Sequence, residues 1–219
     1  MKVKAVIFDF NGTLFFDTAF HDIAWAKTVK EITGSKINDE IRIRLHGSNN
    51  AQTIHNLKPE LSELENEYYS LQKEALYRAI CLENPDKLHL VDGAIELFQY
   101  LKENKIPFTI ASASIKENID FFFDIFSLGD YFDINHVFYD DGSYPTKIEM
   151  YQATLKDMNV DAKDCIIFED SKTGITCAKS IGAGYIVGIS KEALPETLIE
   201  YGANECIDHF LQFNYEILK

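Results

Sequence analysis

The chain has 219 residues, of which 46% are hydrophobic and 26% charged, and this balance is typical of a globular protein rather than a disordered or fibrous one. Its formal net charge of −14 disfavours nucleic acid and anionic membranes as partners, because both are themselves negatively charged. An anionic substrate would therefore need a local cation, such as a lysine or a metal ion, to hold it.

The four cysteines form no Cys-x-x-Cys pair and no closely spaced set with histidine, so they indicate neither a zinc site nor a redox pair. A reducing compartment is the simplest interpretation of this cysteine usage. The first apolar run covers only residues 5–8, which is too short for a signal-peptide core or a membrane-spanning helix. We expect a cytoplasmic protein that is a monomer or a weak homodimer.

Four apolar runs have the pattern of strands that are buried on both faces of a parallel sheet. They cover residues 5–8, 108–111, 165–168 and 185–189. Helical patterns alternate with the later runs and cover 93–102 after Asp92 as N-cap, 116–126, 147–158 after Thr146 as N-cap, and 172–181 before Gly182. The alternation predicts an α/β fold with a doubly wound, Rossmann-like parallel sheet that binds its ligand at the carboxyl ends of the strands.

Residues 17–85 contain no buried-strand run. Apolar residues recur there at helical spacing, as in Leu61, Leu64, Tyr68, Leu71, Ala75 and Leu76. Asn84-Pro85 indicates where this region ends, because proline restricts the residue before it and ends a helix. We therefore expect an α-helical domain over 17–85, inserted into a core domain that consists of 1–16 and 86–219.

Polar side chains follow three of the predicted strands and begin one predicted helix. They are Asp9, Asn11 and Thr13 after the first strand, Ser112 and Ser114 after the second, Glu169 and Asp170 after the third, and Lys147 at the helix start. Because the carboxyl ends of parallel strands meet at one edge of the sheet, we expect these side chains to converge. Three neighbouring carboxylates repel one another unless a cation neutralises them, and Mg²⁺ prefers such hard oxygen ligands. The set predicts a magnesium site at which Lys147 and Ser112 hold a phosphoryl group against Asp9.

The chain resembles the haloacid dehalogenase (HAD) superfamily through four motifs in order. They are Asp9-Phe10-Asn11-Gly12-Thr13-Leu14, Ser112, Lys147 and Glu169-Asp170-Ser171, the last completed by Gly174. The run from Asp17 to His21 and the later Trp25 resemble the start of the cap domain in the β-phosphoglucomutase-like subgroup.

The resemblance implies a role for each matching residue. Asp9 would be the nucleophile that forms an aspartyl-phosphate, and Ser112 and Lys147 would bind the phosphoryl oxygens. Mg²⁺ would lie near Asp9, Asp170, Glu169 and the backbone carbonyl of Asn11. The helical insertion would be a mobile cap that closes over the substrate and excludes water.

Position 11 departs from the pattern of the superfamily. Phosphatases and mutases usually have a second aspartate there, which protonates the leaving group and deprotonates the attacking water. Asn11 transfers no proton near neutral pH, so the contribution of about 10²- to 10⁴-fold that acid–base catalysis makes to the rate is at risk. His21, early in the first cap helix, is a candidate for a substitute proton donor.

The cap position that would contact the substrate is Asn50, by the count of the superfamily from Gly47. Phosphonoacetaldehyde hydrolases have lysine there and hexose-phosphate mutases have arginine, and a neutral amide replaces neither. Haloacid dehalogenases work without a metal and typically have tyrosine at position 11. Ser48 and Asn50 together with Thr13 and Ser114 complete the substrate-binding set that we predict.

Several of these residues also have a purely structural interpretation. Taken singly, Asp170 would cap the helix that begins near Ser171, and Ser112 and Ser114 would be turn or cap residues. Lys147 lies about two residues later than in the pattern Lys-Pro-x-Pro-Asp of relatives, a shift that its flexible four-carbon side chain can bridge.

The combined pattern predicts a magnesium-dependent phosphatase that acts on a small phosphorylated metabolite, with an efficiency limited by Asn11. The alternatives are a hydrolase of carbon–halogen or carbon–phosphorus bonds, a sugar-phosphate mutase, and a protein that binds a phosphorylated metabolite with little or no turnover.

Overall fold

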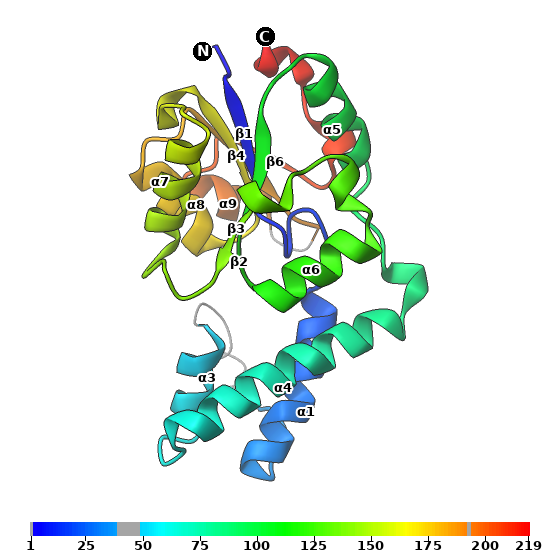
Figure 1. Cartoon of the computed structure of the whole chain (residues 1–219), viewed down its shortest axis with the longest axis vertical. Coiled ribbons are helices and arrows are strands. Elements are labelled where there is room, and N and C mark those ends of the chain that lie inside the picture. The colour runs from blue at the N-terminus through cyan, green and yellow to red at the C-terminus, as the bar shows by residue number, and fades with distance from the viewer. Residues whose placement is uncertain (1, 39–48, 192–193) are drawn as a thin grey trace. The chain divides into compact units, whose positions relative to one another are not determined.

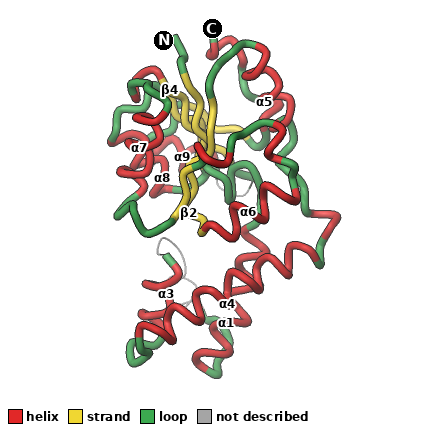
Figure 2. The backbone as a smooth tube through the Cα atoms, in the orientation of Figure 1, coloured by secondary structure: helices red, strands yellow, loops and turns green. Residues whose placement is uncertain are grey.

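The computed structural model describes residues 2–38, 49–191 and 194–219, and Figures 1 and 2 show its backbone. The chain divides into two compact units. The core unit consists of Met1–Phe16 and His89–Lys219, and the helical unit consists of Asp17–Leu88.

The core unit contains one six-stranded sheet with the strand order β3-β2-β1-β4-β5-β6. The strands are β1 (Ala5–Phe8), β2 (Phe108–Ile115), β3 (Phe138–Asp140), β4 (Cys165–Glu169), β5 (Tyr185–Ile189) and β6 (Glu205–Ile207). Every neighbouring pair is parallel. The chain winds to one side of β1 through β2 and to the other side through β4, so the winding reverses at β1. In such sheets ligands bind at this reversal, beyond the carboxyl ends of the strands.

Helices of the core unit lie on both faces of this sheet (Figure 1). They are α5 (Ala94–Glu103), α6 (Lys116–Ile125), α7 (Lys147–Asp157), α8 (Lys172–Ser180) and α9 (Pro195–Tyr201). Side chains of α7, α8 and α9 share a buried apolar cluster with Ala5 and Ile7 of β1. On the opposite face Phe8 lies edge-on to Phe98 of α5, with ring centroids 5.4 Å apart. The alternation of apolar runs and amphipathic helices thus produces a sheet that is covered on both faces.

The α/β fold class that the sequence predicts, with an inserted helical domain, is confirmed, and so are the four long strands. Thr146 is the N-cap of α7 as predicted, in a capping box with Glu149. Asp92 is not an N-cap, because Gly93 occupies that position with a φ of 86°. A Cβ atom at Gly93 would lie 2.5 Å from the backbone nitrogen of Leu211, so this close approach requires glycine. The short strands β3 and β6 were not predicted.

The helical unit contains α1 (Thr18–Thr33), α3 (Asn50–Leu57) and α4 (Glu63–Leu82). Its apolar cluster includes Trp25, Val29 and Ile32 of α1 and Ile54 of α3. The helix that the apolar spacing indicates forms as α4, but Leu64 and Tyr68 are 78% and 53% exposed. The buried residues of α4 are instead Lys73, Glu74, Tyr77, Ile80 and Cys81.

Short 3₁₀ segments complete the described structure. They are Pro85–Lys87, Leu128–Asp130, Ile134–His136, Ala162–Asp164, Phe210–Gln212 and Tyr215–Leu218. Within the described ranges no helix has the length and apolar character needed to cross a lipid bilayer.

Candidate active site

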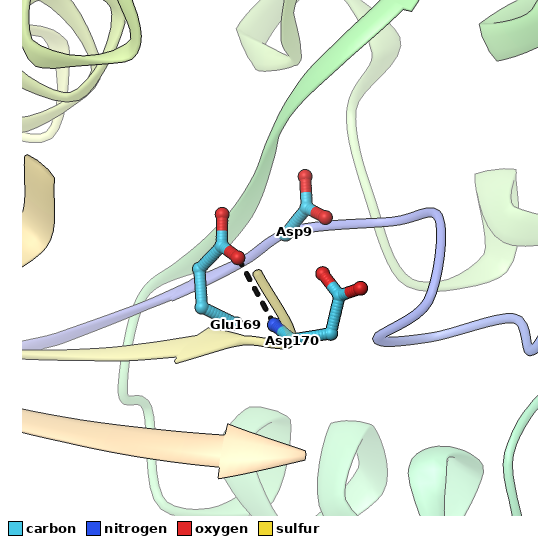
Figure 3. Close-up of side chains that lie close together, drawn as sticks. All are labelled: Asp9, Glu169 and Asp170. Carbon is cyan, nitrogen blue, oxygen red and sulfur yellow. Dashed lines mark hydrogen bonds between the residues drawn. The ribbon is translucent and has the colours of Figure 1, made fainter. Parts of the chain in front are cut away.

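Three carboxylates lie together at the carboxyl ends of β1 and β4 (Figure 3). Asp9 follows β1, Glu169 ends β4 and Asp170 comes next, and one carboxylate oxygen of each lies within 4.8 Å of the other two. The pairing of Phe8 with Phe168 sets this position, and the backbone N–H of Asp9 donates to the Phe168 carbonyl at 3.0 Å. The structure thus brings together the three acids that the sequence placed at neighbouring strand ends.

Lys147 reaches the same point from α7. It is the first residue of this helix, and its Nζ donates to Asp9 Oδ1 at 2.8 Å and to Glu169 Oε1. The later sequence position of Lys147 is therefore bridged by its side chain, of which only 11% is exposed. Burial alone would lower the pKa of Lys147, but the attraction of Asp9 and Glu169 outweighs it and raises this pKa well above the ordinary value.

The two acids that contact Lys147 respond to burial in different ways. Burial raises the pKa of the Asp9 carboxyl from 3.8 to about 7, against the attraction of Lys147 and with the repulsion of Glu169. Burial also acts on Glu169, but there the ion pair with Lys147 outweighs it and lowers the pKa. One lysine leaves the three carboxylates with excess negative charge, which a divalent cation would balance. The donor set, three oxygen-bearing acids in one cluster, therefore fits Mg²⁺.

Glu169 already accepts hydrogen bonds on both carboxylate oxygens. Its Oε2 accepts from the backbone N–H groups of Asp170 and Ser171, both at 3.0 Å, and from the Ser171 hydroxyl at 3.1 Å. Its Oε1 accepts from Lys147 and from the Tyr151 hydroxyl, the latter at 3.0 Å. Asp170 does not cap α8, because Ser171 holds the N-cap position and accepts from the N–H of Gly174.

Two glycines allow the acids to come this close. Gly12 has a φ of 75°, and a Cβ atom there would lie 2.1 Å from Asp170 Oδ2. A Cβ atom at Gly174 would lie 1.7 Å from Glu169 Oε1. The turn at Gly12 is closed by its N–H, which donates to the carbonyl of Phe15 at 2.8 Å. Both positions therefore exclude any side chain.

Asn11 and the two serines of β2 lie at the same edge of the core unit. Ser114 Oγ donates to Asn11 Oδ1 at 2.5 Å, and Ser112, which is buried, accepts from the N–H of Ser114 at 3.2 Å. Both serines lie inside β2 rather than after it, because the strand continues to Ile115 beyond an irregularity in its pairing with β3. Thr13 is fully buried, and its Oγ1 has no hydrogen-bond partner among the described residues.

The remaining predicted site residues belong to the helical unit. His21 Nδ1 lies 2.7 Å from Lys73 Nζ, and His21 Nε2 lies 3.3 Å from Asp17 Oδ2. Asn50 Nδ2 donates to Glu74 Oε1 at 2.6 Å. Ser48 lies outside the described residues.

A buried polar cluster surrounds His21, and the sequence pattern gave no sign of it. Lys73 Nζ donates to Glu74 Oε1 at 2.8 Å, and the Tyr77 hydroxyl donates to Asp17 Oδ2 at 2.5 Å. Burial lowers the pKa of Lys73, whereas the Glu74 pKa falls to about 2 because the attraction of Lys73 and His21 outweighs burial. Apolar spacing gives no signal for such a cluster, since its members are charged.

Residues 3–182 match the family model of haloacid dehalogenase-like hydrolases. A phosphorylated carbohydrates phosphatase of Thermotoga maritima is 27% identical in an alignment of 194 residues that covers 85% of this chain and 85% of its own. The crystal structure of a HAD hydrolase of family IA, variant 3, from Entamoeba histolytica is 34% identical and has a TM-score of 0.89, covering 100% of this chain and 97% of its own. A β-phosphoglucomutase from Clostridium difficile is 24% identical, with a TM-score of 0.80 over 99% and 95% of the two chains, and shares the fold.

These matches agree with the four motifs and with the arrangement of the acids at the strand ends, and the resemblance predicted from the sequence is confirmed. Because the family model covers residues 3–182 of the 219, the chain belongs to the haloacid dehalogenase-like hydrolases.

Proposed function

We propose that the protein is a magnesium-dependent phosphatase that acts on a small phosphorylated metabolite through an aspartyl-phosphate on Asp9. The observation that carries this proposal is the contact of Lys147 Nζ with Asp9 Oδ1, 2.8 Å long, inside a cluster of three acids. A cation and a buried carboxylate at one point are what a nucleophilic attack on a phosphoryl group needs. The name of the Thermotoga maritima relative supports a phosphorylated carbohydrate as the substrate class.

The residues of the core unit have separate roles in the two steps of the proposed hydrolysis. A carboxylate oxygen of Asp9 attacks phosphorus, and the bond from phosphorus to the alcohol oxygen breaks. Water then attacks the same phosphorus, which releases phosphate and restores the carboxylate. Lys147 and Ser112 bind the phosphoryl oxygens during both steps. Asp9, Asp170 and the backbone carbonyl of Asn11, with Glu169 beside them, would hold Mg²⁺, which neutralises phosphoryl charge when it is bound.

The leaving alcohol needs a proton when its bond to phosphorus breaks, and Asn11 cannot supply it. We propose that His21 supplies this proton. His21 Nδ1 lies 2.7 Å from Lys73 Nζ, close enough for the two groups to exchange a proton. Replacing His21 by Asn should lower turnover and change its pH profile, whereas His89→Asn, at an exposed histidine, should do neither. An unchanged profile in His21→Asn would refute this role.

A screen of phosphorylated metabolites, with and without Mg²⁺, tests the main proposal. Wild type should release phosphate only with Mg²⁺, and Asp9→Asn should release none, while the surface variant Asp161→Asn should behave as wild type. Asn11→Asp should increase turnover, by up to about 10²- to 10⁴-fold if proton transfer limits the rate. Release of phosphate by Asp9→Asn at the rate of wild type would rule out the aspartyl-phosphate.

Asn11 also favours a second candidate, a protein that binds a phosphorylated metabolite without turnover. Ligand-induced thermal stabilisation without phosphate release, in wild type but not in Asp9→Asn, would support it. A sugar-phosphate mutase is disfavoured, because Asn50 has no charge for a second phosphate and donates its amide to the Glu74 carboxylate.

A further inference from the structure

Tyr151 lies one helical turn after Lys147 on the same face of α7. Its side chain is fully buried, and its hydroxyl donates to Glu169 Oε1 at 3.0 Å. The Nζ atom of Lys147 lies 5.6 Å from the centre of its ring. None of the four sequence motifs includes this tyrosine, yet it contacts two residues that do belong to them.

The position of the Lys147 ammonium depends on how firmly Glu169 is held. Lysine carries its charge at the end of a flexible chain with a large rotamer entropy, so a fixed position requires fixed partners. Glu169 is such a partner because its Oε2 accepts from two backbone N–H groups and a hydroxyl of the Ser171 turn. Among the described residues, Lys147 and Tyr151 donate to Oε1, so the Tyr151 hydroxyl is the contact besides Lys147 itself that can orient this oxygen.

We propose that Tyr151 is a positioning residue, which orients the Glu169 carboxylate with its hydroxyl and supports Lys147 with its ring so that the ammonium stays at Asp9. The proposal rests on the roles proposed for Asp9 and Lys147. The hydrogen bond from the Tyr151 hydroxyl also partly neutralises the negative charge on Oε1, so that Glu169 attracts Lys147 less strongly. Without the hydroxyl, Lys147 should turn toward Glu169 and away from the phosphoryl group.

Tyr151→Phe removes this hydroxyl and keeps the ring and its packing. Beryllium fluoride with Mg²⁺ mimics the phosphoryl group on Asp9. The affinity of this variant for it should fall about 10- to 100-fold, the range for residues that orient site side chains by hydrogen bonding to them. The ¹⁹F resonance of the fluorine nearest Lys147 should shift. If turnover is measured, kcat should fall more than KM rises, because the phosphoryl charge that Lys147 meets is largest in the transition state.

Thr154→Val is the matched control. Thr154 is also fully buried on α7, and its hydroxyl donates to the carbonyl of Met150 at 2.8 Å, so the change removes a hydroxyl from the same helix without touching Glu169. The control should bind beryllium fluoride as wild type does, with an unchanged ¹⁹F spectrum. If Tyr151→Phe does not fold, 3-fluorotyrosine at position 151 replaces it, since this residue alters the donor strength of the hydroxyl and keeps the packing.

The outcomes separate the two proposals. Wild type that binds no beryllium fluoride with Mg²⁺ overturns the proposed function. Wild type that binds it, with Tyr151→Phe equal to wild type in affinity and in ¹⁹F spectrum, overturns only the role of Tyr151; the same result for the fluorotyrosine protein does so where Phe is not tolerated.

Discussion

The Asp9 carboxyl is buried, and its pKa of about 7 lies well above the unfolded value of 3.8. Between these two values the unfolded chain has lost this proton while the folded, metal-free protein keeps it. The ionisation of Asp9 therefore favours unfolding more strongly as the pH rises from about 4 to about 7, and the effect is constant above that range.

This pH dependence can be measured by comparing wild type with Asp9→Asn. In EDTA, the free energy of unfolding of Asp9→Asn minus that of wild type should become more positive from about pH 4 to about pH 7 and then level off. The difference removes the contribution of the acids that do not interact with Asp9, which both proteins share. A difference that is flat over this range would show that Asp9 has an ordinary pKa in the folded protein.

The residues of the acidic cluster were predictable because strand ends are visible in the sequence. Asp9, Glu169 and Asp170 directly follow or end apolar runs, and parallel pairing brings such ends together. The contacts of Tyr151 with Glu169 and of Lys73 with His21 were not predictable, because the partners lie 18 and 52 residues apart and no local pattern links them. Contacts of this kind arise only from the tertiary packing.

Among the elements, the long strands were predicted correctly because they are buried on both faces and read as apolar runs. The strands β3 and β6 have three residues each, with Asp140 and Glu205 among them, and such short mixed segments give no pattern. Helix α4 was expected in the correct region, but the spacing of its apolar residues gave no sign that Lys73 and Glu74 lie inside as an ion pair. The spacing of hydrophobic residues cannot indicate a helix face whose buried residues are charged.

The Lys73–Glu74 pair should behave as a coupled unit. Removing one partner leaves the other charge buried without compensation, which costs about 3–5 kcal/mol. Lys73→Met and Glu74→Gln should each lower the free energy of unfolding of the helical unit by about this amount, and the double variant should lose less than the sum. Urea denaturation in a double-mutant cycle measures the coupling. Strict additivity would mean that the two side chains do not form a pair.

The start of α8 provides a prediction about Gly174. Alanine is favoured over glycine inside a helix by about 1 kcal/mol, but its methyl group would overlap the buried Glu169 carboxylate. Overpacking costs about 1–3 kcal/mol, so Gly174→Ala should be destabilising on balance and should displace Glu169 from Lys147. Denaturation by urea and phosphate release measure the two effects. Gly129→Ala, where nothing lies within 4 Å of the added atom, is the control, and equal stability of both variants would contradict the overlap.

For the whole molecule, the charge of −14 makes local compensation at the acidic cluster necessary. A ligand that binds only the folded state stabilises it, by about 2.7 kcal/mol at a concentration 100 times its Kd. Mg²⁺ should therefore raise the melting temperature of wild type, and EDTA should reverse the rise. Asp170→Asn should lose most of this response, while Asp161→Asn, at the surface, should keep it. A rise of equal size in Asp170→Asn would place the ion elsewhere.

The turn after Asn11 also bears on how the protein ages. An Asn-Gly pair converts to acid when the glycine nitrogen attacks the asparagine side chain and forms a cyclic imide. Here that nitrogen donates its hydrogen to Phe15, and Ser114 holds the side-chain oxygen. The folded protein should thus preserve an amide at position 11 during storage, whereas unfolded chains accumulate aspartate and isoaspartate there, which mass spectrometry of the peptide resolves. Acid found at this position would then indicate past unfolding. In an activity assay, such molecules would have the carboxylic acid at position 11 that the encoded asparagine lacks.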